Sequence, residues 1–383
     1  MSPKAKMEYL KAICSRYKKA SKKKKSTILN EFCQNCSYHR KHAIRLLNSF
    51  RRPKKPKANP RGRPSTYKRF FVLKPLKRIW LASNLPCSKR LKAILPLWLP
   101  YYKEEFAELS KDVIAALLRM SPATIDRLIK PVRTKYKRRG RATTKPGSLL
   151  RKHIPIKTDQ WDETKPGFLE ADTVAHCGDS LSGFFVYTLD CVDIATGWSE
   201  QRATWGKGEG GVLEQIKDIE KSIPFTLLGF DSDNGSEFLN HHLMRHLTKR
   251  DAPVQFTRSR PYHKDDNAHI EQKNWTHVRQ WFGYFRLDNP NLVPLMNELY
   301  KSEWGLYHNF FCPSTKLLNK KRVASKIIKS YDSPKTPYQR LMDSKELSGS
   351  IKIELKEQFD TLNPFKLRKA MEGKLKKIFA KIH

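Results

Sequence analysis

The chain has 383 residues, enough for two or three domains that each bury a core. Its 76 Lys and Arg outnumber its 37 Asp and Glu and give a formal net charge of +39. Residues 1–150 hold 40 of those cations but only 7 of those acids. This distribution favours a polyanion-binding front portion joined to a more balanced working domain, with nucleic acid preferred over a membrane surface as the polyanion.

Hydropathy and cysteine content bear on location. No apolar run approaches the ~20 residues that a membrane span needs, and the best candidate, residues 94–102, is broken by Pro96 and Pro100. The start of the chain shows no apolar signal-peptide core. Seven cysteines, an odd number, favour reduced thiols. We therefore expect a cytoplasmic, nucleoid-associated protein with no membrane partner.

Residues 1–50 show the pattern of a small all-α DNA-binding domain. Apolar residues recur at helical spacing in three short runs between residues 5 and 48. The third run carries Arg40, Lys41 and Arg45 beside its apolar stripe, so one face can pack inward while the other offers cations to a DNA groove. A helix-turn-helix domain is predicted, with a plain helical bundle as the alternative.

Two basic segments read as linkers. Residues 51–66 are too rich in proline for a helix, and their Arg-Gly-Arg-Pro core, with Arg61 and Arg63, is similar to an AT-hook that lies along an A·T-rich minor groove. An ordinary basic linker is the alternative. Residues 133–160 form a second basic linker, in which Arg138 and Arg139 are expected to contact DNA phosphates.

Between these linkers, residues 67–132 predict a second helical domain. One helix is expected over residues 109–120. Ser121 and Pro122 then supply a cap and a proline at the first position of a helix that continues over residues 123–130. Helix, tight turn and helix again indicate a helix-turn-helix DNA-binding domain.

Residues 161–315 change to an α/β pattern. Three strands with short connections are followed by strands that alternate with helices, which is the order of the ribonuclease-H-like fold. The expected strands are 167–174, 183–189, 197–203, 225–230 and 254–256, and the expected helices are 212–219, 239–247, 267–285 and 293–311. Residues 316–383 read as a basic tail that ends in an amphipathic helix over residues 367–382.

The most informative stretch is Asp231-Ser-Asp-Asn-Gly-Ser-Glu-Phe238, which follows a buried apolar run. Ser236 stands where a helix cap would be expected. A carboxylate at the end of a buried strand must be solvated, paired or bound to metal, because burying a bare charge is costly. A simple Asp-Asn-Gly turn is the alternative interpretation.

Three blocks together carry a family resemblance: Leu-Glu-Ala-Asp172-Thr, the Asp-Asn-Gly-Ser-Glu-Phe block that begins at Asp233, and His-Ile-Glu271-Gln-Lys-Asn. In this order, the sequence resembles the DDE integrase/transposase superfamily of retroviral integrases and bacterial insertion-sequence transposases. The resemblance covers roughly residues 160–315. It implies a bacterial mobile-element protein and a catalytic, metal-binding triad of Asp172, Asp233 and Glu271.

The family's activity implies particular cofactors and partners. Two Mg²⁺ ions, with Mn²⁺ as an alternative, would stabilise the attacking and leaving oxygens of a DNA phosphodiester, and carboxylates suit such hard cations. The implied partners are double-stranded DNA, as terminal inverted repeats and as target, and further copies of the chain in a homodimer or larger complex. No residue becomes covalently linked to DNA in this scheme. The alternatives are a ribonuclease-H-like nuclease that does not transpose, and an inactive DNA-binding regulator.

Several acidic residues compete with the triad. Asp231 and Glu170 share a strand face with Asp233 and Asp172, and the family pattern prefers the latter pair. Asp190 and Asp193, at the end of the second strand, are interpreted as turn residues, with the orientation of metal ligands as the alternative.

The sequence after Glu271 also departs from the pattern of retroviral integrases. Retroviral integrases place lysines four and seven residues after the glutamate, where this chain has Trp275 and Val278. We therefore expect Lys273, Asn274 and Arg279 to contact the DNA backbone instead.

Overall fold

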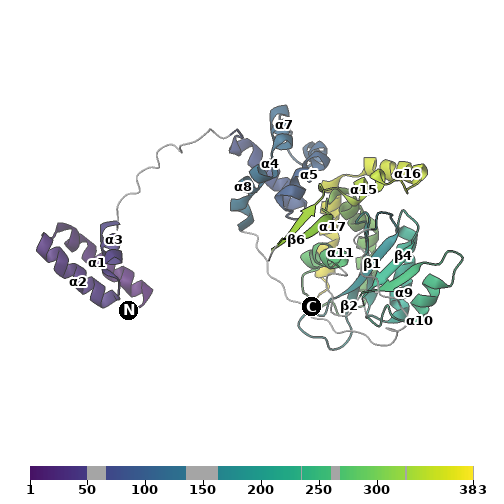
Figure 1. Cartoon of the computed structure of the whole chain (residues 1–383), viewed down its shortest axis with the longest axis horizontal. Coiled ribbons are helices and arrows are strands. Elements are labelled where there is room, and N and C mark those ends of the chain that lie inside the picture. The colour runs from purple at the N-terminus through teal and green to yellow at the C-terminus, as the bar shows by residue number, and fades with distance from the viewer. Residues whose placement is uncertain (50–65, 135–162, 234, 260–267, 324–325, 383) are drawn as a thin grey trace. The chain divides into compact units, whose positions relative to one another are not determined.

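The computed structural model describes residues 1–49, 66–134, 163–233, 235–259, 268–323 and 326–382 (Figure 1). Arg61 and Arg63 of the AT-hook-like segment, and Arg138 and Arg139 of the second linker, lie outside the described residues. By contacts the chain divides into two compact units, Met1–Thr66 and Tyr67–His383.

The first unit is a three-helix bundle, as the apolar spacing predicts. Its helices are α1 (Pro3–Lys19), α2 (Lys22–Cys36) and α3 (Arg40–Ser49). The side chain of Ser2 caps α1, and Phe32 and Leu47 are fully buried where the helices meet. The helical content is confirmed, while the helix-turn-helix assignment of this unit stays a prediction.

The second unit begins with a helical portion. Its members are α4 (Arg69–Ala82), α5 (Ser88–Trp98), η1 (Leu99–Tyr101), α6 (Tyr102–Glu105), α7 (Lys111–Arg119) and α8 (Pro122–Arg133). The turn between α7 and α8 forms as expected, because the Ser121 side chain accepts from Thr124 N and Pro122 occupies the first turn. Ile125 and Ile129 of α8 are buried in the common core.

A five-stranded mixed sheet lies at the centre of the second unit, in the order β3-β2-β1-β4-β5. Strands β1, β2 and β3 form an antiparallel meander, while β4 and β5 run parallel to β1. The strands are β1 (Phe168–Ala175), β2 (Val186–Asp193), β3 (Ser199–Trp205), β4 (Gly229–Ser232) and β5 (Gln255–Arg258). This order and these directions fit the expected ribonuclease-H-like core.

Helices cover both faces of the sheet (Figure 1). Arg202 on β3 reaches α9, whereas its neighbour Gln201 bonds Asp190 on the opposite face, the one that faces α11. The helices that follow β3 are α9 (Glu209–Ser222), α10 (His241–Thr248), α11 (Ala268–Lys273), the π-helix η4 (Asn274–Arg279), α12 (Gln280–Phe282), α13 (Leu292–Leu299), the π-helix η5 (Tyr300–Trp304) and α14 (Gly305–Phe311).

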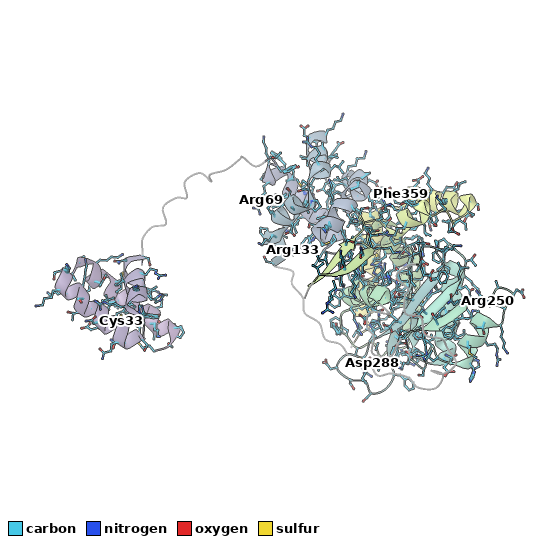
Figure 2. The ribbon with its side chains drawn as sticks, viewed as in Figure 1. Cys33, Arg69, Arg133, Arg250, Asp288 and Phe359 are labelled. Atoms are coloured by element: carbon cyan, nitrogen blue, oxygen red, sulfur yellow. The ribbon has the colours of Figure 1, made fainter. Side chains whose placement is uncertain are left out.

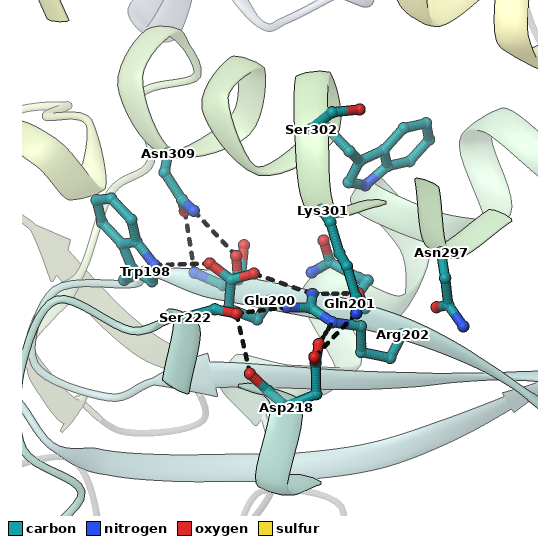
Figure 3. A network of polar contacts seen from close by, with 12 residues as sticks. Trp198, Glu200, Gln201, Arg202, Asp218, Ser222, Asn297, Lys301, Ser302 and Asn309 are labelled. Carbon is teal, nitrogen blue, oxygen red and sulfur yellow. Dashed lines mark hydrogen bonds and ion pairs between the residues drawn. The ribbon is translucent and has the colours of Figure 1, made fainter. Parts of the chain in front are cut away.

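A buried ionic network fixes α9 on β3 (Figure 3). The fully buried guanidinium of Arg202 donates to Asp218 at 2.5 Å, to Glu200 at 3.1 Å and to Ser222 at 2.8 Å. Lys301 adds a 2.8 Å ion pair to Asp218. A buried cation with this many acceptors is paired and hydrogen-bonded, as its burial requires.

The segment 316–383 is expected as a basic tail, but its described residues are folded as part of the second unit. Their elements are the hairpin β6 (Leu317–Val323) and β7 (Lys326–Tyr331), followed by α15 (Pro337–Asp343), α16 (Gly349–Thr361) and α17 (Pro364–Phe379). Phe359, labelled in Figure 2, stacks on Tyr338 with 4.8 Å between ring centroids. Phe365 meets Trp98 of α5 with 4.9 Å between ring centroids. The C-terminal helices therefore close the core against the helical portion that opens this unit.

Two local expectations need correction. Within the run 225–230, Phe225 and Leu227 are buried, but pairing with β1 begins only at Gly229, so β4 starts later than predicted. Ser236 caps no helix, because Phe238 and Leu239 turn back on Gly235 and α10 begins after Asn240, whose side chain caps it. Among the described residues, no helix has the length and apolar content to cross a bilayer.

Candidate active site

The parallel pairing of β1 with β4 brings two of the three expected acids together. The register pairs Ala171 with Ser232, so the next residues along the two strands, Asp172 and Asp233, are neighbours at the edge where β4 ends. Their charges interact strongly enough for Asp233 to raise the pKa of Asp172. The pairing of β1 with β4 therefore brings together two acids that lie about sixty residues apart in the sequence.

Asp172 is held in one orientation by two hydrogen bonds. Its Oδ1 accepts from the Thr173 N–H at 2.7 Å, and its Oδ2 accepts from the Asn274 side-chain amide at 2.7 Å. Burial raises the pKa of Asp172 well above the usual carboxyl range, and the nearby Asp233 raises it further. A carboxylate in this position gains from any cation that neutralises it.

Asp233 lies near a further acid, Glu237. Its Oδ1 accepts from the Gly235 N–H at 2.9 Å. Burial raises the pKa of Asp233, the buried Glu237 raises it further, and Lys207 opposes both effects. Glu237 in turn accepts from the Thr173 hydroxyl at 3.0 Å and forms a 3.5 Å ion pair with Lys207. The loop after β3 therefore supplies a cation to this edge.

Glu271 lies on α11, the helix that packs on this region, but its side chain is exposed. The helix is docked on either side of Glu271: the Ile270 N–H donates to Glu170 at 3.0 Å, and Asn274 donates to Asp172. Within the described ranges, no three His, Cys, Asp or Glu side chains are grouped so as to hold a metal ion. The structure thus brings Asp172 and Asp233 together and leaves Glu271 outside their cluster.

Two further ionisable groups, Asp190 and Lys273, are buried near this pair. Asp190 lies opposite Asp172 in the β1–β2 register and accepts from Gln201 at 2.8 Å. Burial raises the pKa of Asp190, whereas Lys273 lowers it. Asp190 is therefore an interior strand residue and not the expected turn residue, whereas Asp193 does close a turn by accepting from Gly167 and Thr196.

The rival acids are held by structural contacts. Asp231 is 3% exposed and accepts from the Thr257 hydroxyl on β5. Glu170 is 1% exposed and accepts the backbone bond from α11. Both contacts join neighbouring elements.

The expected DNA contacts differ in their exposure. Arg40, Lys41 and Arg45 are exposed along α3, with Arg40 donating to Asn30 and to Ser26 at 3.2 Å. Lys41 and Arg45 therefore leave cations on the surface of the bundle.

The residues expected to contact DNA after Glu271 are mostly engaged within the protein. Lys273 is 7% exposed and donates to the Gly197 carbonyl at 2.9 Å, so the structure places its ammonium inside the protein instead of against phosphate. Asn274 orients Asp172, and Arg279 donates to the Ala175 carbonyl at 2.8 Å. The sequence alone does not identify Asn274 as the donor that orients Asp172. It also does not identify Glu237 as the acid next to Asp233, although Glu237 stands inside the Asp-Asn-Gly-Ser-Glu-Phe block.

The donor set suits a hard divalent cation. Asp172 and Asp233 present carboxylate oxygens whose mutual repulsion and burial a cation would relieve, and Mg²⁺ is commonly held by one or two carboxylates with water completing its shell. The pair alone supplies two protein ligands. A third ligand from Glu271 requires that side chain to turn toward the pair.

Comparison with known proteins identifies a family. The chain belongs to the family of the uncharacterized protein y4rM of Sinorhizobium fredii (strain NBRC 101917 / NGR234), with 36% identity over 335 residues that cover 87% of this chain and 94% of that protein. No protein-family model matches the sequence. Among solved structures, the catalytic core domain of BIV integrase is similar, with 15% identity, coverage of 50% of this chain and 97% of that chain, and a TM-score of 0.28. Because this overlap is loose, the fold is assigned from strand order and direction instead.

Proposed function

We propose that the protein is a transposase or integrase of a mobile DNA element, which cleaves the 3′ ends of the element and joins them to target DNA. The observation that carries the proposal is the pairing of Asp172 with Asp233 at the end of β4, on a mixed sheet of ribonuclease-H-like order. The net charge of +39 supports a DNA substrate.

In this proposal Asp172, Asp233 and Glu271 hold Mg²⁺, which supplies charge stabilisation to the attacking and leaving oxygens. Water first attacks the phosphodiester at the element's end and leaves a free 3′-hydroxyl. That hydroxyl then attacks a target phosphodiester and displaces its 3′ oxygen. Asn274 keeps Asp172 in one orientation through its 2.7 Å hydrogen bond. Since two element ends must meet, the active complex contains at least two copies of the chain.

The test is a strand-transfer assay with Mg²⁺ and a labelled duplex that carries the DNA sequences flanking the gene. We expect Asp233→Asn and Glu271→Gln to abolish joining while keeping duplex binding within about twofold. Glu271→Gln is the sharper variant, because this exposed side chain should contribute little to stability. The control is Glu357→Gln, an equally exposed acid on α16.

Three results would overturn the proposal. Normal joining by Asp233→Asn would remove the catalytic assignment. Cleavage without joining would indicate a plain nuclease. Binding of these flanking sequences with neither cleavage nor joining by the wild type would indicate a DNA-binding regulator.

A further inference from the structure

An open cavity of about 530 Å³ lies beside the helix that carries Glu271, within the size range of ligand pockets. Three parts of the second unit build it: the α4–α5 turn, the segment from η4 to Tyr284, and α17. We call it the aromatic pocket, after its main lining residues Trp275, Arg279, Trp281, Tyr284, Arg368 and Leu375.

The aromatic pocket adjoins the proposed active site through the chain itself. Asn274, which bonds Asp172, is followed directly by Trp275, and Trp275 comes four residues after Glu271. Arg279 donates to the carbonyl of Ala175 at 2.8 Å, at the end of the strand that carries Asp172. Trp275 and Arg279 therefore lie on a segment that is anchored at two points to β1, the strand that carries Asp172.

Aromatic rings and arginine guanidinium groups line the pocket. Trp275 is 39% exposed and Tyr284 is 40% exposed, so both rings offer surface to a ligand. The guanidinium of Arg279 lies 4.8 Å from the Tyr284 ring centre, and that of Arg368 lies 4.2 Å from the Trp281 ring centre. Such surfaces stack on nucleobases, which present a π-face whatever their sequence.

The charge of the pocket favours a base over a cluster of phosphates. Arg368 donates from Nε to Glu372 at 2.7 Å, and this acid also lines the cavity, so one of the two cations is offset. Asn84 and Gln280 bond each other at 3.0 Å on another wall and present amides rather than charges. The lining is therefore mainly aromatic and amide, with a single uncompensated cation from Arg279.

We infer that the aromatic pocket binds an unstacked nucleobase of the DNA end on which the active site acts, with Trp275 as its stacking platform. The inference rests on the proposed function, because it takes a DNA end as the substrate. It further states that the protein recognises an unpaired nucleotide next to the phosphodiester that is cleaved. Trp275 here acts as a binding and positioning residue.

The test compares two duplexes of 30 base pairs, one blunt and one with an overhang of four thymidines, by fluorescence anisotropy with the full chain in EDTA. The wild type should prefer the overhang. Trp275→Ala should weaken overhang binding by about tenfold, the loss of one base–aromatic stack, and blunt binding by less than twofold. Trp275→Phe should retain most of the preference. A 2-aminopurine placed in the overhang should be quenched by the wild type and not by Trp275→Ala.

The matched control is Trp205→Ala, since Trp205 is 38% exposed but lies at the end of β3, outside the pocket lining. It should change neither affinity. Equal losses on both duplexes from Trp275→Ala, or an unaltered overhang preference in that variant, would overturn the inference. Free adenosine monophosphate that competes with the labelled duplex as strongly as unlabelled overhang duplex does would also overturn the inference. If the wild type joins ends yet shows no overhang preference, this inference fails while the proposed function stands; if it binds no DNA, the proposed function fails.

Discussion

Asn274 donates a 2.7 Å hydrogen bond to Asp172, and this contact ties the helix that carries Glu271 to the central strand of the sheet. The bond has two consequences. It satisfies one oxygen of a half-buried carboxylate, and it fixes where the exposed Glu271 stands relative to the acidic pair.

Removing that amide should therefore destabilise the fold. Asn274→Ala leaves Oδ2 of Asp172 without its donor, and we expect a loss of about 1–3 kcal/mol in the free energy of unfolding. Urea titrations measure this loss. The control Gln272→Ala, an exposed residue of the same helix, should change stability by less than about 0.5 kcal/mol. A loss no larger than the control's would show that Asn274 does not support Asp172.

Divalent cations should stabilise the folded chain through the acidic pair. Because Mg²⁺ bound to Asp172 and Asp233 relieves their repulsion, the Tm should rise with Mg²⁺ concentration as binding to the folded state saturates. Differential scanning fluorimetry measures the shift. Asp172→Asn and Asp233→Asn should each remove it, and Asp179→Asn, an exposed acid, should keep it. A shift that survives both site variants would place the cation elsewhere.

Acid should unfold the protein partly through His176. Burial, with a smaller effect of Arg279, lowers the pKa of His176 to about 3, and its Nε2 lies 2.8 Å from the Thr188 hydroxyl. Since the unfolded state takes up this proton near pH 6.5, stability is lost as pH falls from about 6.5 toward 3, by up to about 1.4 kcal/mol per pH unit.

Urea titrations at pH 7, 6, 5 and 4 test this dependence. His176→Gln should flatten the slope by about one proton, while the exposed His242→Gln should not. Equal slopes in both variants would contradict the assignment. The comparison between variants isolates His176 from the buried acids, whose raised pKa values act in the opposite direction.

The Arg202 network should be the most costly charge cluster to break. Arg202→Leu leaves Glu200 buried without its cation, and we expect a loss of about 3–5 kcal/mol. Arg250→Leu, which removes a more accessible pair with Glu220, should cost about 1 kcal/mol or less. Denaturant midpoints measure the loss of stability in the two variants. Equal losses would contradict the expectation that breaking the buried Arg202 network costs more than breaking the accessible Arg250 pair.

The two units should separate cleanly. A fragment of residues 67–383 should fold with the Tm of the full chain, because Met1–Thr66 forms its own contacts. A fragment of residues 163–315 should fail to give a cooperative transition, since it lacks Trp98 and Phe365 from the shared aromatic core. Scanning calorimetry of both fragments decides, and a cooperative transition in the shorter one would show that the flanking helices are dispensable.

Local patterns predicted the elements of the sheet well. The first three strands were placed within three residues of their starts, because strict burial and short connections mark β1, β2 and β3 in the sequence. The fourth was misplaced since Phe225 and Leu227 are buried by packing, whereas hydrogen bonding to β1 begins only at Gly229. Apolar composition reports burial and cannot by itself report which residues pair.

The site was less predictable, because its chemistry depends on partners far away in sequence. Lys273 looked like a surface cation, yet the oppositely charged Asp190 on β2 and the Gly197 carbonyl allow it to be buried. The six-residue π-helix after it, Asn274–Arg279, left no trace in the apolar spacing, although it changes which side chains share a face. The position of Glu271 outside the acidic cluster likewise follows from helix docking.

The contact between Trp98 and Phe365 also constrains how the protein is made. Phe365 belongs to α17, which is synthesised long after Trp98, so the aromatic surface around Trp98 stays open to solvent until α17 has left the ribosome. The larger unit therefore completes its aromatic core only once α17 is available, whereas the three-helix bundle is free to fold while the larger unit is still being translated.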